Sequence, residues 1–136
     1  QYDLWIASHP HDQGLPRVLN RRCWQRVVLN QDLDKALADC DQAIAIDPDD
    51  ALALDSRAWL WLRQRLWQKA RAEFDRSLAK KADGYSSLYG RGIARLNLGD
   101  KAGGEADLAA ARKLRPEVDA RYERDGLSAA QLAPHE

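Results

Sequence analysis

Apolar residues recur at helical spacing along most of the chain. In the segment ALADCDQAIAI, for example, Ala36, Cys40, Ala43 and Ile44 recur at three- and four-residue steps, so they share one face of an α-helix. Polar stretches that contain Pro or Gly separate such segments, and these residues end helices or occupy tight turns. No segment alternates apolar and polar residues as a half-buried strand does. The pattern therefore predicts an all-α fold.

The helical segments repeat at a nearly constant interval, the sequence signature of a repeat protein. Three stretches place an Arg, a small residue and a large apolar residue after a Leu: LNRRCWQRVV, LDSRAWLWLR and LYGRGIARLN. They begin at Leu19, Leu54 and Leu88, so the first interval is one residue longer than the second. The helical segments that follow them end at equal intervals, at Pro48, Ala82 and Pro116. The additional residue of the first unit therefore lies between its two helices, near residues 30–32.

This period divides the chain into three helical pairs and two flanks. The pairs are predicted at residues 16–50, 51–84 and 85–118. Because YDLWIASHP superposes on CDQAIAIDP, residues 1–10 are predicted to be the second helix of an incomplete preceding unit. Residues 119–127 are predicted to be a capping helix, with Tyr122 facing inward and Arg121 outward, and residues 128–136 a flexible tail.

The three units resemble the tetratricopeptide repeat family over residues 16–118, a family whose helix-turn-helix unit has the same period. Marker positions of the family match at Leu19, Leu54, Leu88, Cys23, Ala58, Gly92, Ala36, Ala70, Phe74, Ala43, Ala111, Pro48 and Pro116. The chain departs from the pattern at Gly104, Ser77 and Ala82, and at the turn, where Gln31 and Arg65 stand and only Gly99 keeps the usual residue. The resemblance implies a right-handed α-solenoid of antiparallel helix pairs.

In this family the first helices of the units line a concave groove that holds peptides or partner helices. The matching positions are Asn20, Arg21, Trp24, Asp55, Ser56, Trp59, Arg63, Tyr89, Ile93 and Asn97, together with Leu52 and Ser86. Trp24, Trp59 and Ile93 are expected to form an apolar ladder along the groove. The alternative is that one or both tryptophans pack between adjacent units, since large aromatic side chains are usually buried.

One subtype of the family binds a partner's C-terminal carboxylate through Lys, Asn and Arg side chains. The corresponding positions here are Asn20, Trp24, Ser56, Ser86 and Gly90, of which only Asn20 is a suitable type. The resemblance therefore disfavours that subtype and favours an apolar or aromatic ligand.

The two cysteines fall at one level of the first helical pair. Residues that face each other in a helical hairpin lie at equal distances from the turn, and Cys23 and Cys40 are equidistant from a midpoint between Gln31 and Asp32. They are candidates for a disulfide if their Cβ atoms approach within about 4 Å. The alternative is two reduced cysteines that pack as small apolar residues. A disulfide predicts a periplasmic protein, and reduced cysteines a cytoplasmic one.

Composition and local motifs argue against several classes of function. The 21 basic and 21 acidic residues balance, which disfavours nucleic-acid binding, and no apolar run is long enough to insert into a membrane. The pair His9 and His11 lacks a third metal ligand, DPDD lacks the calcium-loop pattern, and the Gly-rich stretch from Tyr89 lacks the features of a phosphate loop. Gly90 and Gly92 are expected instead to let helices approach closely. We expect no catalytic residue, metal or cofactor.

The sequence thus predicts a non-catalytic protein-interaction module that binds a peptide or flexible segment of a partner. One alternative is a C-terminal accessory domain of a larger bacterial enzyme, such as a secreted peptidase. A bacterial origin is suggested by heavy use of Arg, Ala and Leu, and the start at Gln1 without any Met suggests a trimmed product or a piece of a longer protein. Another alternative is a homodimer formed through the N-terminal helix, where Trp5 is expected to have an uncovered side.

Overall fold

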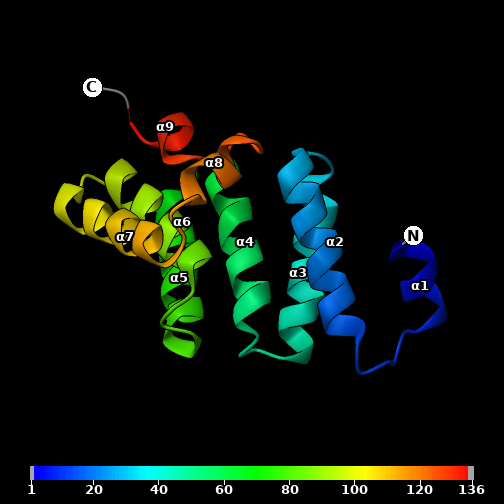
Figure 1. Cartoon of the computed structure of the whole chain (residues 1–136). Helices are drawn as coiled ribbons and strands as arrows, with labels where there is room; N and C mark the ends of the chain where they lie inside the picture. The colour runs from blue at the N-terminus through cyan, green and yellow to red at the C-terminus, as the bar shows by residue number, and fades with distance from the viewer. Residues whose placement is uncertain (1, 135–136) are drawn as a thin grey trace.

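The computed structural model describes residues 2–134, which contain nine helices and no strand (Figure 1). The helices are α1 (Tyr2–Ser8), α2 (Leu15–Leu29), α3 (Leu33–Ile46), α4 (Ala51–Arg63), α5 (Trp67–Lys80), α6 (Tyr85–Asn97), α7 (Lys101–Leu114), α8 (Val118–Glu123) and α9 (Ala129–Leu132). The all-α prediction is confirmed. Among the described residues no helix has the length and apolarity needed to cross a membrane.

The helices pack in the order of the chain. Helix α2 packs against α3, α4 against α5, and α6 against α7. Helix α4 also contacts both α2 and α6, so the first helices of the three pairs form a continuous row, visible in Figure 1. This row carries the residues that the sequence assigns to a groove.

Left-handed residues end the first helix of each pair. Asn30, Arg65 and Gly99 have φ of 53°, 60° and 88°, and their intervals along the chain equal those between the three repeated leucines. Each donates its backbone N–H to the carbonyl three residues earlier. The additional residue of the first pair is therefore Gln31, which follows Asn30. This corrects the alignment, because Asn30 rather than Gln31 is equivalent to Gly99, and Asn adopts this conformation more easily than other non-glycine residues.

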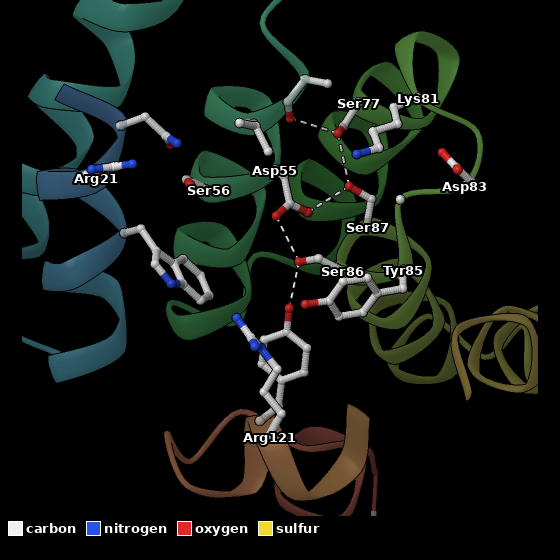
Figure 2. A pocket seen from close by; sticks show the side chains of 16 residues that line it. Arg21, Asp55, Ser56, Ser77, Lys81, Asp83, Tyr85, Ser86, Ser87 and Arg121 are labelled. Carbon is white, nitrogen blue, oxygen red and sulfur yellow. Dashed lines mark hydrogen bonds between the residues drawn. The ribbon is translucent and has the colours of Figure 1, made fainter. Parts of the chain in front are cut away.

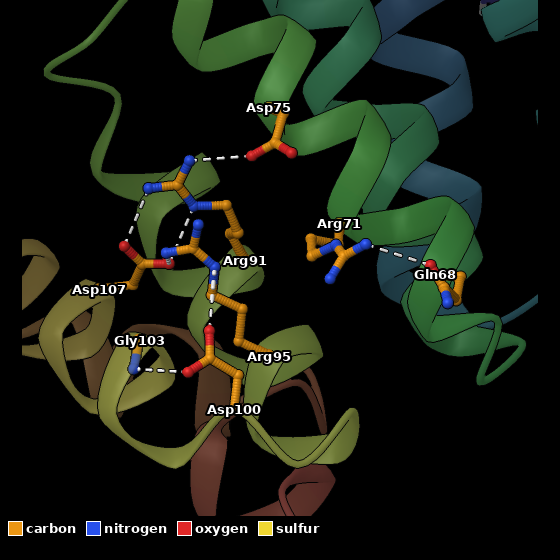
Figure 3. Close-up of polar contacts among 8 residues, drawn as sticks. All are labelled: Gln68, Arg71, Asp75, Arg91, Arg95, Asp100, Gly103 and Asp107. Atoms are coloured by element: carbon orange, nitrogen blue, oxygen red, sulfur yellow. Dashed lines mark hydrogen bonds and ion pairs between the residues drawn. The ribbon is translucent and has the colours of Figure 1, made fainter.

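A partly buried arginine, Arg91, bridges successive pairs. Arg91 of α6 donates to both carboxylate oxygens of Asp107 in α7, at 2.9 Å each, and to Asp75 of α5, also at 2.9 Å (Figure 3). Asp107 is only 5% exposed, and Arg91 and Arg95 are the cations paired with it. A buried carboxylate that loses its arginine is strongly destabilising, by about 3–5 kcal/mol.

The same bridge recurs in the other two pairs. Arg57 of α4 pairs with Glu73 of α5 and with Asp41 of α3. Arg22 of α2 pairs with Asp39 of α3 and with Asp3 of α1. Helix α1 thus packs against α2 through the same kind of ion pair that joins the later helices.

The two cysteines form a disulfide between α2 and α3, with 5.7 Å between the Cα atoms of Cys23 and Cys40. Both residues are completely buried. Of the two alternatives drawn from the sequence, the disulfide is therefore the one that the structure contains.

Close helix packing depends on glycine at two positions of α6. A Cβ atom added to Gly90 would overlap the ring of Phe74, and one added to Gly92 would lie 2.9 Å from Cγ of Leu108. The prediction that Gly90 and Gly92 let helices approach closely is confirmed.

The C-terminal end differs from the prediction. The capping helix α8 ends at Glu123, and the chain turns at Gly126, whose φ is 75°. The predicted flexible tail contains a further helix, α9, which begins with a capping box of Ser128 and Gln131 and buries Leu132 against the core. The sequence did not indicate this helix, because it has only four residues and its position depends on contacts of Leu132 with the core. The rest of the predicted tail at 135–136, like residue 1 of the N-terminal flank, lies outside the described residues.

Candidate functional site

The C-terminal segment, residues 118–132, covers half of the predicted groove. The ring of Tyr122 stacks on Trp59, with 4.6 Å between centroids, and on Tyr89, with 5.2 Å. Trp59, Tyr89 and Ile93 are completely buried. The expected exposed ladder is therefore wrong for Trp59 and Ile93, because folding the capping helix back over them removes more apolar surface from water than leaving them open. Trp24 packs edge-on against Trp59 and stays partly exposed.

Three polar residues of the predicted groove hold this C-terminal segment. Arg63 donates to the carbonyls of Val27 and Val28 in α2 and, at 2.6 Å, to that of Asp125. Asn97 donates to the carbonyl of Leu132 at 2.9 Å.

Tyr89 is the third residue that holds the C-terminal segment, through its hydroxyl group. It accepts the backbone N–H of Ala129 at 2.7 Å and donates to Asp119 at 2.8 Å. Burial raises the pKa of Tyr89 well above its usual value, so its proton remains available for donation. Most of the contacts that Arg63, Asn97 and Tyr89 make with the segment are to main-chain atoms.

The other half of the groove remains open as a pocket of about 270 Å³ (Figure 2). Seven predicted residues line it: Asn20, Arg21, Trp24, Leu52, Asp55, Ser56 and Ser86. Trp59, Arg63, Tyr89, Ile93 and Asn97 do not line it. Nine further residues do, and the sequence did not indicate them: Ala51, Ser77, Lys81, Asp83, Gly84, Tyr85, Ser87, Arg121 and Tyr122.

These additional residues come mainly from two places. Residues 81–87 form the turn that follows α5 and the start of α6. Helix α6 borders the groove because it contacts α4. Arg121 and Tyr122 come from α8. The position of the first group follows from the helical pairing, whereas that of the second depends on how the capping helix folds back.

A network of hydroxyl groups around Asp55 forms the floor of the pocket. Ser87 Oγ lies 2.7 Å from Asp55 Oδ1, and Ser86 Oγ donates to Asp55 Oδ2 at 2.8 Å. Ser86 in turn accepts from the indole N–H of Trp59 at 3.0 Å and from the hydroxyl of Tyr122 at 2.7 Å. The network therefore joins α4, α6 and α8, as the dashed lines of Figure 2 show.

Burial raises the pKa of Asp55 to about 6, although the hydrogen bonds from Ser87, Ser86 and Trp59 act in the opposite direction. Burial also raises the pKa of Tyr122, so its hydroxyl stays protonated and donates to Ser86. Asp55 consequently gains its negative charge close to neutral pH.

One buried polar atom of a lining residue has no partner. Oδ1 of Asn20 is buried and accepts no hydrogen bond from the residues that the structure describes. A buried acceptor without a donor costs about 1–3 kcal/mol.

The candidate metal residues of the sequence lie apart from this pocket. His9 stacks on Trp5 with 4.3 Å between centroids, and its Nδ1 lies 2.8 Å from the carbonyl of Trp5. His11 is exposed. Among residues 2–134, no cluster of three or more His, Cys, Asp or Glu side chains is arranged to hold a metal ion.

Comparisons with protein-family models, with curated proteins and with solved structures found no match to this chain.

Proposed function

We propose that this chain is a non-catalytic interaction module whose pocket between α2, α4 and α6 binds a peptide or flexible segment of a partner protein. The observation that carries the proposal is the division of the groove into an occupied and an open half. The occupied half holds a segment of the chain through Arg63, Tyr89 and Asn97, in large part by main-chain hydrogen bonds. Such bonds suit the recognition of flexible segments, since every peptide offers the same main-chain groups.

The open half has the composition of a binding site. Leu52, at 59% exposure, and partly exposed Trp24 supply apolar surface, and polar groups of Asn20, Ser56 and Ser86 surround them. Aromatic and apolar anchors with a polar rim are characteristic of protein interfaces.

The proposal includes a right-handed superhelix of tetratricopeptide type for the three pairs. The interval between Arg65 and Gly99, which equals the repeat period, and the recurring arginine bridges support it. The disulfide supports an oxidising compartment, such as the bacterial periplasm.

Selection from a random peptide library tests the function. Peptides that bind the intact chain should lose most of their affinity for the variant Leu52→Asp, which puts a charge at the pocket. The matched control is Leu114→Asp, because Leu114 is similarly exposed, at 47%, and lies outside the pocket. Selected peptides that bind both variants like the unchanged protein would contradict the proposed site.

Self-association is the second candidate, and Leu4 of α1 favours it. Leu4 is 79% exposed, and Trp5 beside it is only partly buried. A second copy would cover this surface. Light scattering tests the idea, since a dimer formed in this way should dissociate in the variant Leu4→Asp, and a monomer at high protein concentration would rule it out.

A further inference from the structure

Positive side chains stand on three sides of the open pocket. Arg21 comes from α2, Lys81 follows the end of α5, and Arg121 comes from α8 (Figure 2). Elsewhere in the molecule Arg22, Arg57 and Arg91 are each paired with acidic residues. Among the described residues, none of the three pocket cations forms an ion pair.

The acidic residues of the pocket do not balance these cations. Asp55 lies at the floor, and both of its oxygens are engaged by Ser86 and Ser87. Asp83 stands on the side of the α5–α6 turn. The three cations therefore leave the mouth of the pocket positive, although the chain as a whole has no net charge. A patch of one sign in a neutral protein favours a ligand of the opposite sign at that place.

The apolar surface of the pocket adds a second requirement. Trp24 and Leu52, which is 59% exposed, line the same pocket as the cations. A free inorganic anion has no apolar surface that could cover them. A peptide offers carboxylates together with apolar side chains that match Trp24 and Leu52.

We infer that the pocket binds a peptide carboxylate next to an apolar or aromatic residue, with Arg21, Lys81 and Arg121 facing the carboxylate and Trp24 and Leu52 contacting the apolar side chain. This inference rests on the proposed function and specifies its ligand. The cations differ from those of the carboxylate-binding subtype considered from the sequence, since Lys81 comes from an inter-helix turn and Arg121 from the C-terminal segment. The C-terminal segment thus lines the binding site in addition to covering Trp59.

Three short peptides provide the test, with binding followed by the backbone amide NMR shifts of the protein at millimolar peptide. The first is N-acetyl-Ala-Phe-Glu-Ala-amide, and the second replaces Glu by Gln and is neutral. The third keeps Gln but has a free C-terminal carboxylate, which separates a side-chain carboxylate from a terminal one. At least one charged peptide should bind about tenfold more tightly than the neutral one, the usual effect of a charge-assisted hydrogen bond.

The variant Arg121→Gln should remove this preference. The control is Arg124→Gln, because Arg124 follows α8, is also exposed and does not line the pocket. Equal affinity for neutral and charged peptides, or an unchanged preference in Arg121→Gln, would overturn the inference and leave peptide binding itself standing. If none of the three peptides shifts the pocket amides, the inference is also wrong. The proposed function is then decided separately by the library selection.

Discussion

The ring of Tyr122 lies on the indole of Trp59, and the Tyr122 hydroxyl and the Trp59 N–H meet at the same oxygen, Oγ of Ser86. This contact closes one half of the groove and forms an edge of the other. It joins residues far apart in the sequence, on α4 and α8.

The variant Tyr122→Ala should expose Trp59 and destabilise the protein. The loss of a buried aromatic ring costs about 3–5 kcal/mol, and the variant Tyr122→Phe, which loses only the hydrogen bond to Ser86, should cost about 1 kcal/mol. Urea unfolding followed by tryptophan fluorescence measures both. Similar stabilities for the two variants would show that the ring of Tyr122 does not cover Trp59.

Sequence periodicity predicts the three pairs well, because each helix buries a repeating apolar face and each first helix ends at a left-handed residue. It could not decide whether Trp59 is exposed. An apolar pattern shows which face of a helix leaves water, but not which element covers it. The covering element is α8, whose position depends on distant contacts of Asp125 with Arg63 and of Asp119 with Tyr89. Arg121 escaped prediction as a pocket residue for the same reason.

The variant Arg63→Met should loosen the C-terminal segment. The guanidinium of Arg63 is the donor to three carbonyls, and methionine keeps much of its volume without those hydrogen bonds. We expect a loss of about 2–3 kcal/mol in unfolding free energy. Relative to the unchanged protein, amide hydrogen exchange should become faster in α9 by a larger factor than in α3. The control is Arg17→Met, at an exposed position of α2. Equal exchange in α9 of both variants would contradict a clamping role for Arg63.

Removal of the disulfide should lower stability without changing the fold. The bridge between Cys23 and Cys40 closes a short loop, and the double variant Cys23→Ala, Cys40→Ala should lose about 2–4 kcal/mol. Chemical unfolding with and without a reductant measures the loss. A reductant should destabilise the unchanged protein and leave the double variant unaffected. An unchanged midpoint in the unmodified protein would mean that the cysteines are not bridged in solution.

The stability of the protein should depend on Asp55 between pH 4 and pH 6. Its pKa is raised to about 6 in the folded protein, above its value in the unfolded chain, so the folded state binds the proton more tightly. The stabilising contribution of protonated Asp55 is fully present below the unfolded pKa and is lost as the pH rises through the folded pKa. The difference in unfolding free energy between the unchanged protein and Asp55→Asn should therefore fall as the pH rises across this range. A difference that is constant with pH would contradict the raised pKa.

The most direct test of the account is to locate the bound peptide. A library-selected peptide is added to the isotope-labelled protein, and the backbone amides that shift are assigned. The account predicts that they cluster around Asn20, Trp24, Leu52, Asp55 and Ser86, while amides on the exposed faces of α3, α5 and α7 stay unchanged. Shifts confined to those exposed faces, or to α1, would show that the pocket is not the binding site.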